Sequence, residues 1–121
     1  MRATEHAPRD PLRVLEHLHG LVDIVDQLAA TLIELGRYDQ VKSFVLPLLR
    51  HGRRFRMAYA MALYRPAGAS RGEVLEAVEI LEKEVCTDRR VMGPSYPDTL
   101  EALDELDRAS MTLEDYRKFK S

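Results

Sequence analysis

The sequence predicts an all-α fold, a right-handed stack of antiparallel helical hairpins with about six or seven helices. Apolar residues recur at steps of three and four along most of the chain, which is the spacing of one helix face. Leu, Ala, Glu and Arg dominate, and β-branched residues do not gather in alternating runs. In residues 25–48, two apolar stripes flank a glycine turn, and a helix pair this small needs similar neighbours to cover its apolar faces.

The composition indicates one folded domain, because 45% of the 121 residues are hydrophobic. Lysine and arginine number 18 against 20 acids, and this balance argues against a nucleic-acid partner, whose phosphates attract an excess of positive charge. Cys86 is the only cysteine, which excludes an internal disulfide and favours a reducing, cytoplasmic location. We expect no signal peptide and no contact with a membrane, because no apolar run approaches the roughly 20 residues of a membrane span.

The chain is expected to begin with a flexible segment, residues 1–9, followed by a helical domain over residues 10–121. Asp10 is suited to cap the first helix, and Pro11 is suited to its first position. Gly20 allows either one long helix or two helices that meet near it. Apolar residues recur at alternating steps of four and three and form a seam along this segment: Val14, Leu18, Leu21, Val25, Leu28, Leu32 and Leu35. The seam predicts packing within the domain, or alternatively a homodimer through Val14, Leu18, Leu21 and Val25.

The most regular part of the chain is residues 25–48. The first helix of this unit is expected to end at Gly36, which adopts a positive φ without steric cost. A second helix is expected from Tyr38 toward Arg50, and Pro47 is expected to curve it or to break it into two parts. The first apolar face holds Val25, Leu28, Ala29 and Leu32, and the second holds Val41, Val45 and Leu48.

The remaining helices follow from turn and capping signals. An alanine-rich helix is expected over residues 53–65. Ser70 and Glu73 have the spacing of a capping box, which predicts the start of a helix. Gly93, Pro94 and Pro97 end that helix, the next begins near Asp98, and Thr112 has a box-like pattern that predicts one more short helix.

These residues resemble tetratricopeptide repeats. In the first unit the apolar, small and turn positions of that motif are occupied by Leu28, Ala29, Leu32, Gly36, Tyr38, Val41, Val45 and Leu48. Met61-Ala62 and the stretch 77–81 match a second unit. The string RRVMGPSYPDTLEALDEL resembles the inter-repeat segment of kinesin-light-chain-like repeats, and AMALYR with GEVLEAVEILEKEV is similar to the tetratricopeptide-like activation domain of bacterial transcriptional regulators. Over residues 21–119, both resemblances imply a helical scaffold for protein–protein contact.

Residues for catalysis or metal binding do not converge in the sequence. His17 and His19 are two apart, which puts them on different sides of a helix. The chain carries no glycine-rich phosphate loop, and no histidine follows Cys86. We therefore expect no enzyme activity, no catalytic residue, no metal and no cofactor.

The densest charge lies at Arg50, His51, Arg53, Arg54 and Arg56. It predicts either a solvated turn, whose arginine stems cover apolar surface, or an anion clamp. The resemblance to tetratricopeptide repeats implies binding of a protein or peptide segment on the concave side. The candidate partner-binding residues are Asp23, Asp26, Arg53, Arg54, Arg56, Tyr59, Leu63 and Arg108.

The mixed signs of these residues suggest a partner of mixed charge. We expect Arg56→Glu together with Tyr59→Ala to weaken binding without unfolding the domain. The sequence thus predicts a non-enzymatic interaction module. The alternative is an oligomerisation or regulatory domain of a larger signalling or transcription regulator.

Overall fold

The computed structural model describes residues 11–120, with side chains from 23 to 118, and this part of the chain contains helices and no strand. The predicted all-α class is therefore confirmed. The flexible segment expected at residues 1–9 lies outside the described residues. In order, the elements are α1 (Pro11–Glu34), α2 (Tyr38–Val45), the 3-10 helix η2 (Leu46–His51), α3 (Arg53–Tyr64), α4 (Arg71–Met92) and α5 (Pro97–Lys120).

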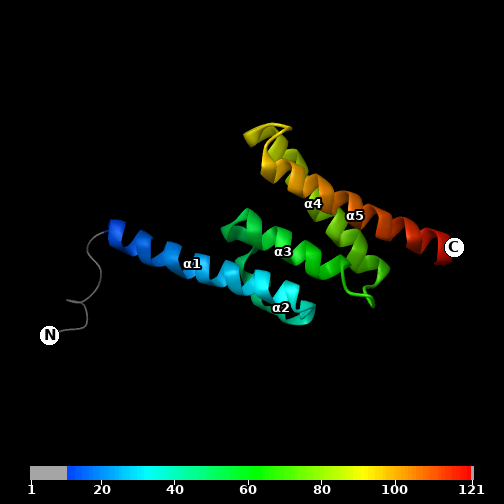
Figure 1. Cartoon of the computed structure of the whole chain (residues 1–121), viewed down its shortest axis with the longest axis horizontal. Helices are drawn as coiled ribbons and strands as arrows, with labels where there is room; N and C mark the ends of the chain where they lie inside the picture. Colours follow the sequence, from blue (N-terminus) through cyan, green and yellow to red (C-terminus); the bar gives the residue numbers. More distant parts are fainter. Residues whose placement is uncertain (1–10, 121) are drawn as a thin grey trace.

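Helix α3 lies at the centre of the molecule (Figure 1) and contacts every other element. Helix α1 packs on α2 and α3, whereas α5 packs on α3 and α4. Figure 1 shows α1 and α5 on opposite sides of α3. The odd-numbered helices therefore form one continuous series, and α2 and α4 each pack against two members of it.

The described residues form five α-helices, fewer than the six or seven that the sequence suggests. Helix α1 continues through Gly20, since one glycine inside a helix costs only about 1 kcal/mol. Helix α5 likewise continues through Thr112. The Thr112 hydroxyl donates to the carbonyl of Arg108 at 3.0 Å, so it bonds back within the same helix instead of capping a new one.

The turns follow the local signals closely. Gly36 has a φ of 73°, and the N–H groups of Gly36 and Arg37 donate to the carbonyls of Ile33 and Leu32 at 3.0 and 2.9 Å. This pair of bonds satisfies the free carbonyls at the end of α1. The expected break at Pro47 is confirmed, because α2 ends at Val45 and a 3-10 helix replaces it.

The predicted capping box at the start of α4 is also confirmed. The Glu73 N–H donates to the Ser70 hydroxyl at 3.1 Å, and the Ser70 N–H donates to the Glu73 carboxylate at 2.9 Å. The side chain of Ser70 and that of Glu73 therefore satisfy two donors that the first turn of a helix leaves free.

Two apolar clusters form the core, and α3 contributes to both. Tyr59 packs against each of them. The first cluster includes Met57, Leu63, Val74, Ala77, Leu81, Ala102 and Ala109. The second includes Ala29, Val41, Val45, Phe55, Ala58 and Ala62.

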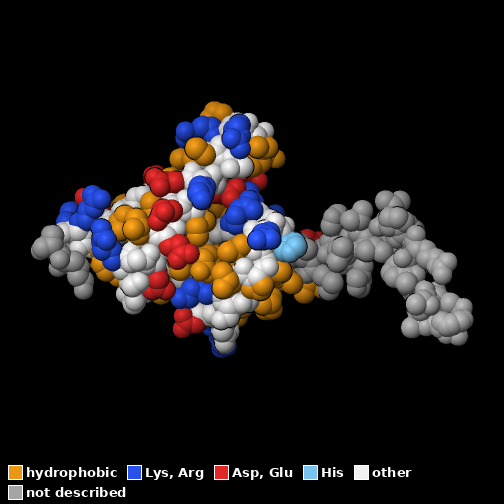
Figure 2. Space-filling model, turned by 180° about the vertical axis from the view of Figure 1, so that it is seen from behind, with side chains coloured by type: hydrophobic (Ala, Val, Ile, Leu, Met, Phe, Trp, Pro, Cys, Tyr) orange, Lys and Arg blue, Asp and Glu red, His pale blue; other side chains and the backbone are white. Residues whose placement is uncertain are grey.

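The buried stripe of α1 differs from the predicted seam. Ala29 is buried, but Leu28 is 45% exposed and Leu35 is 62% exposed. The side chains of Val14, Leu18 and Leu21 lie outside the described residues. Seen from behind, the molecule also shows hydrophobic side chains gathered near the centre of one face, with acidic and basic side chains around them (Figure 2). Part of the apolar surface is therefore left without a covering helix.

Candidate functional site

The arginines at the start of α3 bind acids inside the molecule. Arg53 donates from Nε to Asp88 at 2.9 Å, from Nη1 to Glu101 at 3.1 Å, and from Nη2 to the carbonyl of Asp98 at 2.5 Å. The Asp88 side chain is only 2% exposed. Arg53 therefore connects α3 to both α4 and α5, and its guanidinium has little capacity for a further ligand.

Arg56 lies one turn further along the same face of α3. Its Nε donates to Glu84 at 2.8 Å, and the Glu84 side chain is 4% exposed. We call the four residues Arg53, Arg56, Glu84 and Asp88 the α3–α4 ion network. Burial has removed water from these carboxylates, so loss of the arginine partner would leave the negative charge uncompensated. These pairs are therefore fixed parts of the fold.

Burial is the main influence on the pKa of Asp88. It raises the pKa of this carboxyl above its ordinary value, and the hydrogen bond from Arg53 only partly offsets the rise. A raised carboxyl pKa gives a stability contribution that is complete below the ordinary value of 3.8 and is lost as pH rises through the folded value. The Arg53 guanidinium favours the ionised form of this carboxyl and compensates its charge.

The acids of this network could have been found in the sequence. Glu84 and Asp88 continue the buried stripe of α4 that contains Ala77 and Leu81. An acid in an apolar stripe indicates a partner on the facing helix. Arg53 and Arg56 of the arginine cluster therefore form internal ion pairs, which neither the solvated-turn nor the anion-clamp interpretation included.

The expectation for the variant Arg56→Glu with Tyr59→Ala has to be revised. Arg56→Glu would place a second carboxylate beside the buried Glu84. Tyr59 is half-buried between the two core clusters, and burial raises the pKa of its hydroxyl. Both substitutions act first on stability, so this double variant does not isolate binding.

The other candidate residues have different surroundings. Arg54 is 78% exposed and donates to Asp26 at 2.7 Å. Asp23 is exposed on α1. Leu63, which the resemblance to tetratricopeptide repeats places on the binding surface, is 3% exposed and belongs to the core. Arg108 pairs with Asp104 at 3.1 Å, further along α5.

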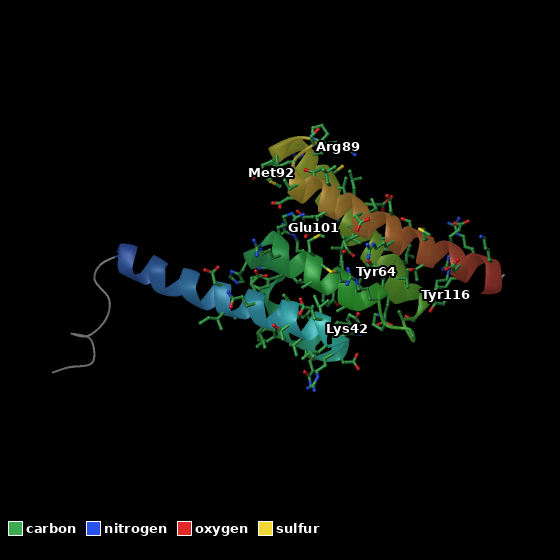
Figure 3. The ribbon with its side chains drawn as sticks, in the orientation of Figure 1. Lys42, Tyr64, Arg89, Met92, Glu101 and Tyr116 are labelled. Carbon is green, nitrogen blue, oxygen red and sulfur yellow. The ribbon has the colours of Figure 1, made fainter. Side chains whose placement is uncertain are left out.

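A hollow of about 280 Å³ lies across α1, α3 and α5 and brings several of these residues together. Its residues are Asp26, Ala29, Ala30, Ile33, Arg53, Arg54, Met57, Ala58, Met61, Asp98 and Glu101. A second hollow of about 390 Å³ adjoins it at the start of α3, shares Asp26, Arg53, Arg54 and Asp98, and adds Asp23 and His51. We call the two together the α1–α3–α5 groove. Figure 3 shows Glu101 on α5 close to the start of α3.

The α1–α3–α5 groove has an apolar floor and a charged rim. Ala30, Ile33 and Met61 supply apolar surface, and small alanines leave room above it. The charged residues come from all three helices. Such a groove can take up apolar parts of a ligand while charged groups fix its direction.

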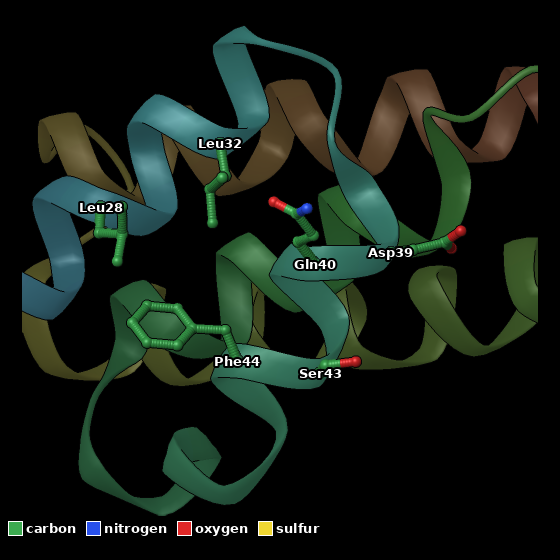
Figure 4. A pocket seen from close by; sticks show the side chains of 6 residues that line it. All are labelled: Leu28, Leu32, Asp39, Gln40, Ser43 and Phe44. Carbon is green, nitrogen blue, oxygen red and sulfur yellow. The ribbon is translucent and has the colours of Figure 1, made fainter.

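Another hollow, of about 510 Å³, lies between α1 and α2 on a different side of α1 (Figure 4). Leu28 and Leu32 contribute from α1, and Phe44 contributes from α2. Its remaining lining residues, Asp39, Gln40 and Ser43, are polar. This surface is mainly apolar, and it does not include the candidate residues.

A buried carboxylate also joins α3 to α5. The Tyr64 hydroxyl donates to Glu105, and Arg65 donates to the same carboxylate at 2.7 Å. Glu105 is 6% exposed. Burial, followed by the hydrogen bond to Glu105, raises the pKa of Tyr64 to about 12. This cluster is a structural contact, in which Tyr64 and Glu105 are buried and Arg65 reaches the surface at 28% exposed.

Within the part of the chain that the structure describes, no group of three histidine, cysteine, aspartate or glutamate side chains is placed to hold a metal ion. Over the same residues, no helix combines the length and the apolar character that crossing a membrane requires. No family model, curated protein or solved structure matches this chain.

Proposed function

We propose that this protein is a non-enzymatic interaction module that binds a protein or peptide segment in the α1–α3–α5 groove. In this proposal the five helices are a right-handed, tetratricopeptide-like stack of antiparallel hairpins, and the groove is its concave side. The observation that carries the proposal is that one hollow is lined by α1, α3 and α5, the helices that alternate along the chain. Helical stacks use the equivalent surface for extended ligands.

The size and lining of the groove suit a peptide better than a small cofactor. Its two hollows, of about 280 and 390 Å³, adjoin one another along the start of α3. A row of adjoining hollows can take successive side chains of one segment. The free and exposed thiol of Cys86 suits the reducing, cytoplasmic setting in which we place the module.

Filling the groove tests the proposal. Ala30 is exposed and lines the floor, so Ala30→Trp adds a large side chain there without displacing core residues. We expect this variant to keep its thermal stability and to lose partners that the wild-type protein retains from an extract of its native source. Ala67→Trp, at an exposed position in the loop between α3 and α4, is the matched control. Equal retention by wild-type protein and Ala30→Trp would refute a function in this groove.

The second candidate function is an oligomerisation or regulatory domain, and two observations favour it. Figure 1 shows the first turns of α1 projecting beyond α2 and α3. Ile24 and Leu28 of α1 are 63% and 45% exposed. A homodimer through the seam would cover this surface, although Val25 is already half-buried against the second core cluster.

Light scattering separates the two functions. If the seam forms a dimer, the wild-type protein has twice the monomer mass, and Leu28→Glu restores the monomer because it places a charge in the apolar contact. A wild-type monomer at high concentration excludes a homodimer through the seam.

A further inference from the structure

The positive charges of Arg53 and Arg56 are cancelled inside the molecule. In the α3–α4 ion network, Arg53 and Arg56 face Asp88 and Glu84, at 2.9 and 2.8 Å. Both acids are under 5% exposed, so no solvent-borne ligand can replace them as partners. The network is therefore close to neutral, and it offers little positive charge to the α1–α3–α5 groove.

The charges that remain around the groove are mainly negative. Arg54 and Asp26 pair with each other at 2.7 Å and cancel. Asp23, Asp98 and Glu101 are left, and they come from α1 on one side and from α5 on the other. Glu101 contacts Arg53 at 3.1 Å, but that guanidinium is already balanced by Asp88.

Two other contributions do not reverse this sign. His51 lines one end of the groove and carries at most one positive charge, fewer than the three carboxylates. The starts of α3 and α5 each carry a partial charge of about +0.5 from the helix dipole. The three carboxylates outweigh the two partial charges of the helix starts, so the groove keeps a net charge of about −2. A polyanion such as RNA would therefore be repelled.

The apolar floor between the two acidic sides adds a second requirement. A ligand side chain has to lie on the half-buried Ile33 and Met61 and still reach a carboxylate. Lysine and arginine meet both conditions, because a long aliphatic stem ends in a cation. We infer that the α1–α3–α5 groove binds a lysine- or arginine-rich segment of a partner protein. This inference rests on the proposed function and specifies that the partner segment is positively charged.

Selection of random twelve-residue peptides on the full chain tests the inference. The peptides that bind wild-type protein but not Ala30→Trp report on the groove. We expect lysine and arginine to be enriched in this set, and aspartate and glutamate to be depleted, relative to the starting library. Enrichment of acidic residues would overturn the inference and leave the proposed function standing. Peptides that bind wild-type protein and Ala30→Trp alike would overturn both.

Charge variants provide the second measurement. We expect Asp23→Asn with Glu101→Gln to weaken binding of a selected basic peptide on the order of three- to tenfold, as for the loss of two exposed ion pairs. Fluorescence anisotropy measures this change, which shrinks at high salt because salt screens exposed charges. Glu79→Gln with Glu82→Gln, on the exposed side of α4, removes the same charge and is expected to leave affinity unchanged.

Equal weakening in the two double variants would show an effect of net charge alone and would overturn the inference. Because Glu101 also contacts Arg53, Asp23→Asn alone is the second test, and a thermal unfolding curve confirms that each variant is folded. An unchanged affinity in Asp23→Asn, together with an unchanged affinity in the double variant, would likewise overturn it.

Discussion

At the scale of residues, Arg53 and Arg54 are neighbours in sequence with opposite surroundings. The Arg53 side chain is 17% exposed and holds the buried Asp88, whereas Arg54 is 78% exposed and pairs with Asp26 at the surface. Successive residues on a helix point about 100° apart, so one faces α4 while the next faces solvent. The energetic importance of each arginine follows from the burial of its acid.

Arg53→Ala is expected to lower the free energy of unfolding by about 3 kcal/mol, because it leaves Asp88 charged and buried without its partner. Arg54→Ala breaks an exposed pair and is expected to cost less than about 1 kcal/mol. Urea unfolding at neutral pH measures both values. Similar losses in the two variants would contradict a structural role for the α3–α4 ion network.

Tyr64 gives a pH dependence in the alkaline range. Its pKa is raised from 10.0 to about 12 by burial and by the hydrogen bond to Glu105, so the folded state keeps a proton that the unfolded state has lost. The stabilisation is complete below pH 10.0 and is lost as pH rises toward about 12.

We expect the free energy of unfolding to fall over this pH range, and Tyr64→Phe to show a shallower fall. Urea unfolding at a series of pH values measures both slopes, with Tyr96→Phe at a 49% exposed position as control. Parallel slopes in wild-type protein and Tyr64→Phe would contradict the assignment.

At the scale of elements, the link between α4 and α5 is fixed by a few local contacts. Gly93 ends α4 with φ 97° and ψ 160°, a conformation that is essentially restricted to glycine. The buried Thr99 hydroxyl donates to the Gly93 carbonyl at 2.8 Å and ties the first turn of α5 to the end of α4. The phrase GPSYPDT therefore sets where α5 starts.

Two glycine variants separate backbone conformation from packing. An added Cβ at either Gly93 or Gly20 would meet no atom within 4 Å. Gly93→Ala is nevertheless expected to destabilise the protein by about 1–3 kcal/mol, because its φ is unfavourable for alanine. Gly20→Ala lies within α1 and is expected to stabilise by about 0.5–1 kcal/mol. Thermal unfolding gives both values, and a stabilising Gly93→Ala would contradict the role of the turn.

At the scale of the whole molecule, α3 connects two cores. It supplies Phe55, Ala58 and Ala62 to one cluster and Met57, Ala60 and Leu63 to the other. Because adjacent positions of one helix belong to different clusters, neither cluster can lose its packing without disturbing the helix that holds the other. The two ends of the molecule are therefore expected to unfold together.

Val41→Ala removes volume from one cluster and Leu81→Ala from the other, at positions that are 0% exposed. We expect losses of about 2 and 3 kcal/mol in the free energy of unfolding. Each variant should keep a single transition, shared by far-ultraviolet circular dichroism and by tyrosine fluorescence. Two separated transitions in either variant would show that α3 does not couple the clusters.

Local signals in the sequence predict the all-α class, the turn at Gly36, an interruption of the helix at Pro47 and the start of α4 after Ser70. Each of these depends on a few neighbouring residues, through a backbone angle, a missing N–H or a capping side chain. The number of helices does not follow from such signals. Gly20 and Thr112 suggest helix boundaries, but a continuous helix tolerates both residues at small cost.

Which side chains meet depends instead on how the helices pack. Arg53 and Asp88 are 35 residues apart, and their contact depends on how α3 and α4 rotate about their axes when they pack. The rotation of α1 likewise buries Ala29 and exposes Leu28, and that of α3 places Leu63 in the core. Hydrophobic spacing gives the apolar side of a helix only to within about one position, roughly 100°, so the composition of the α1–α3–α5 groove follows from packing between helices.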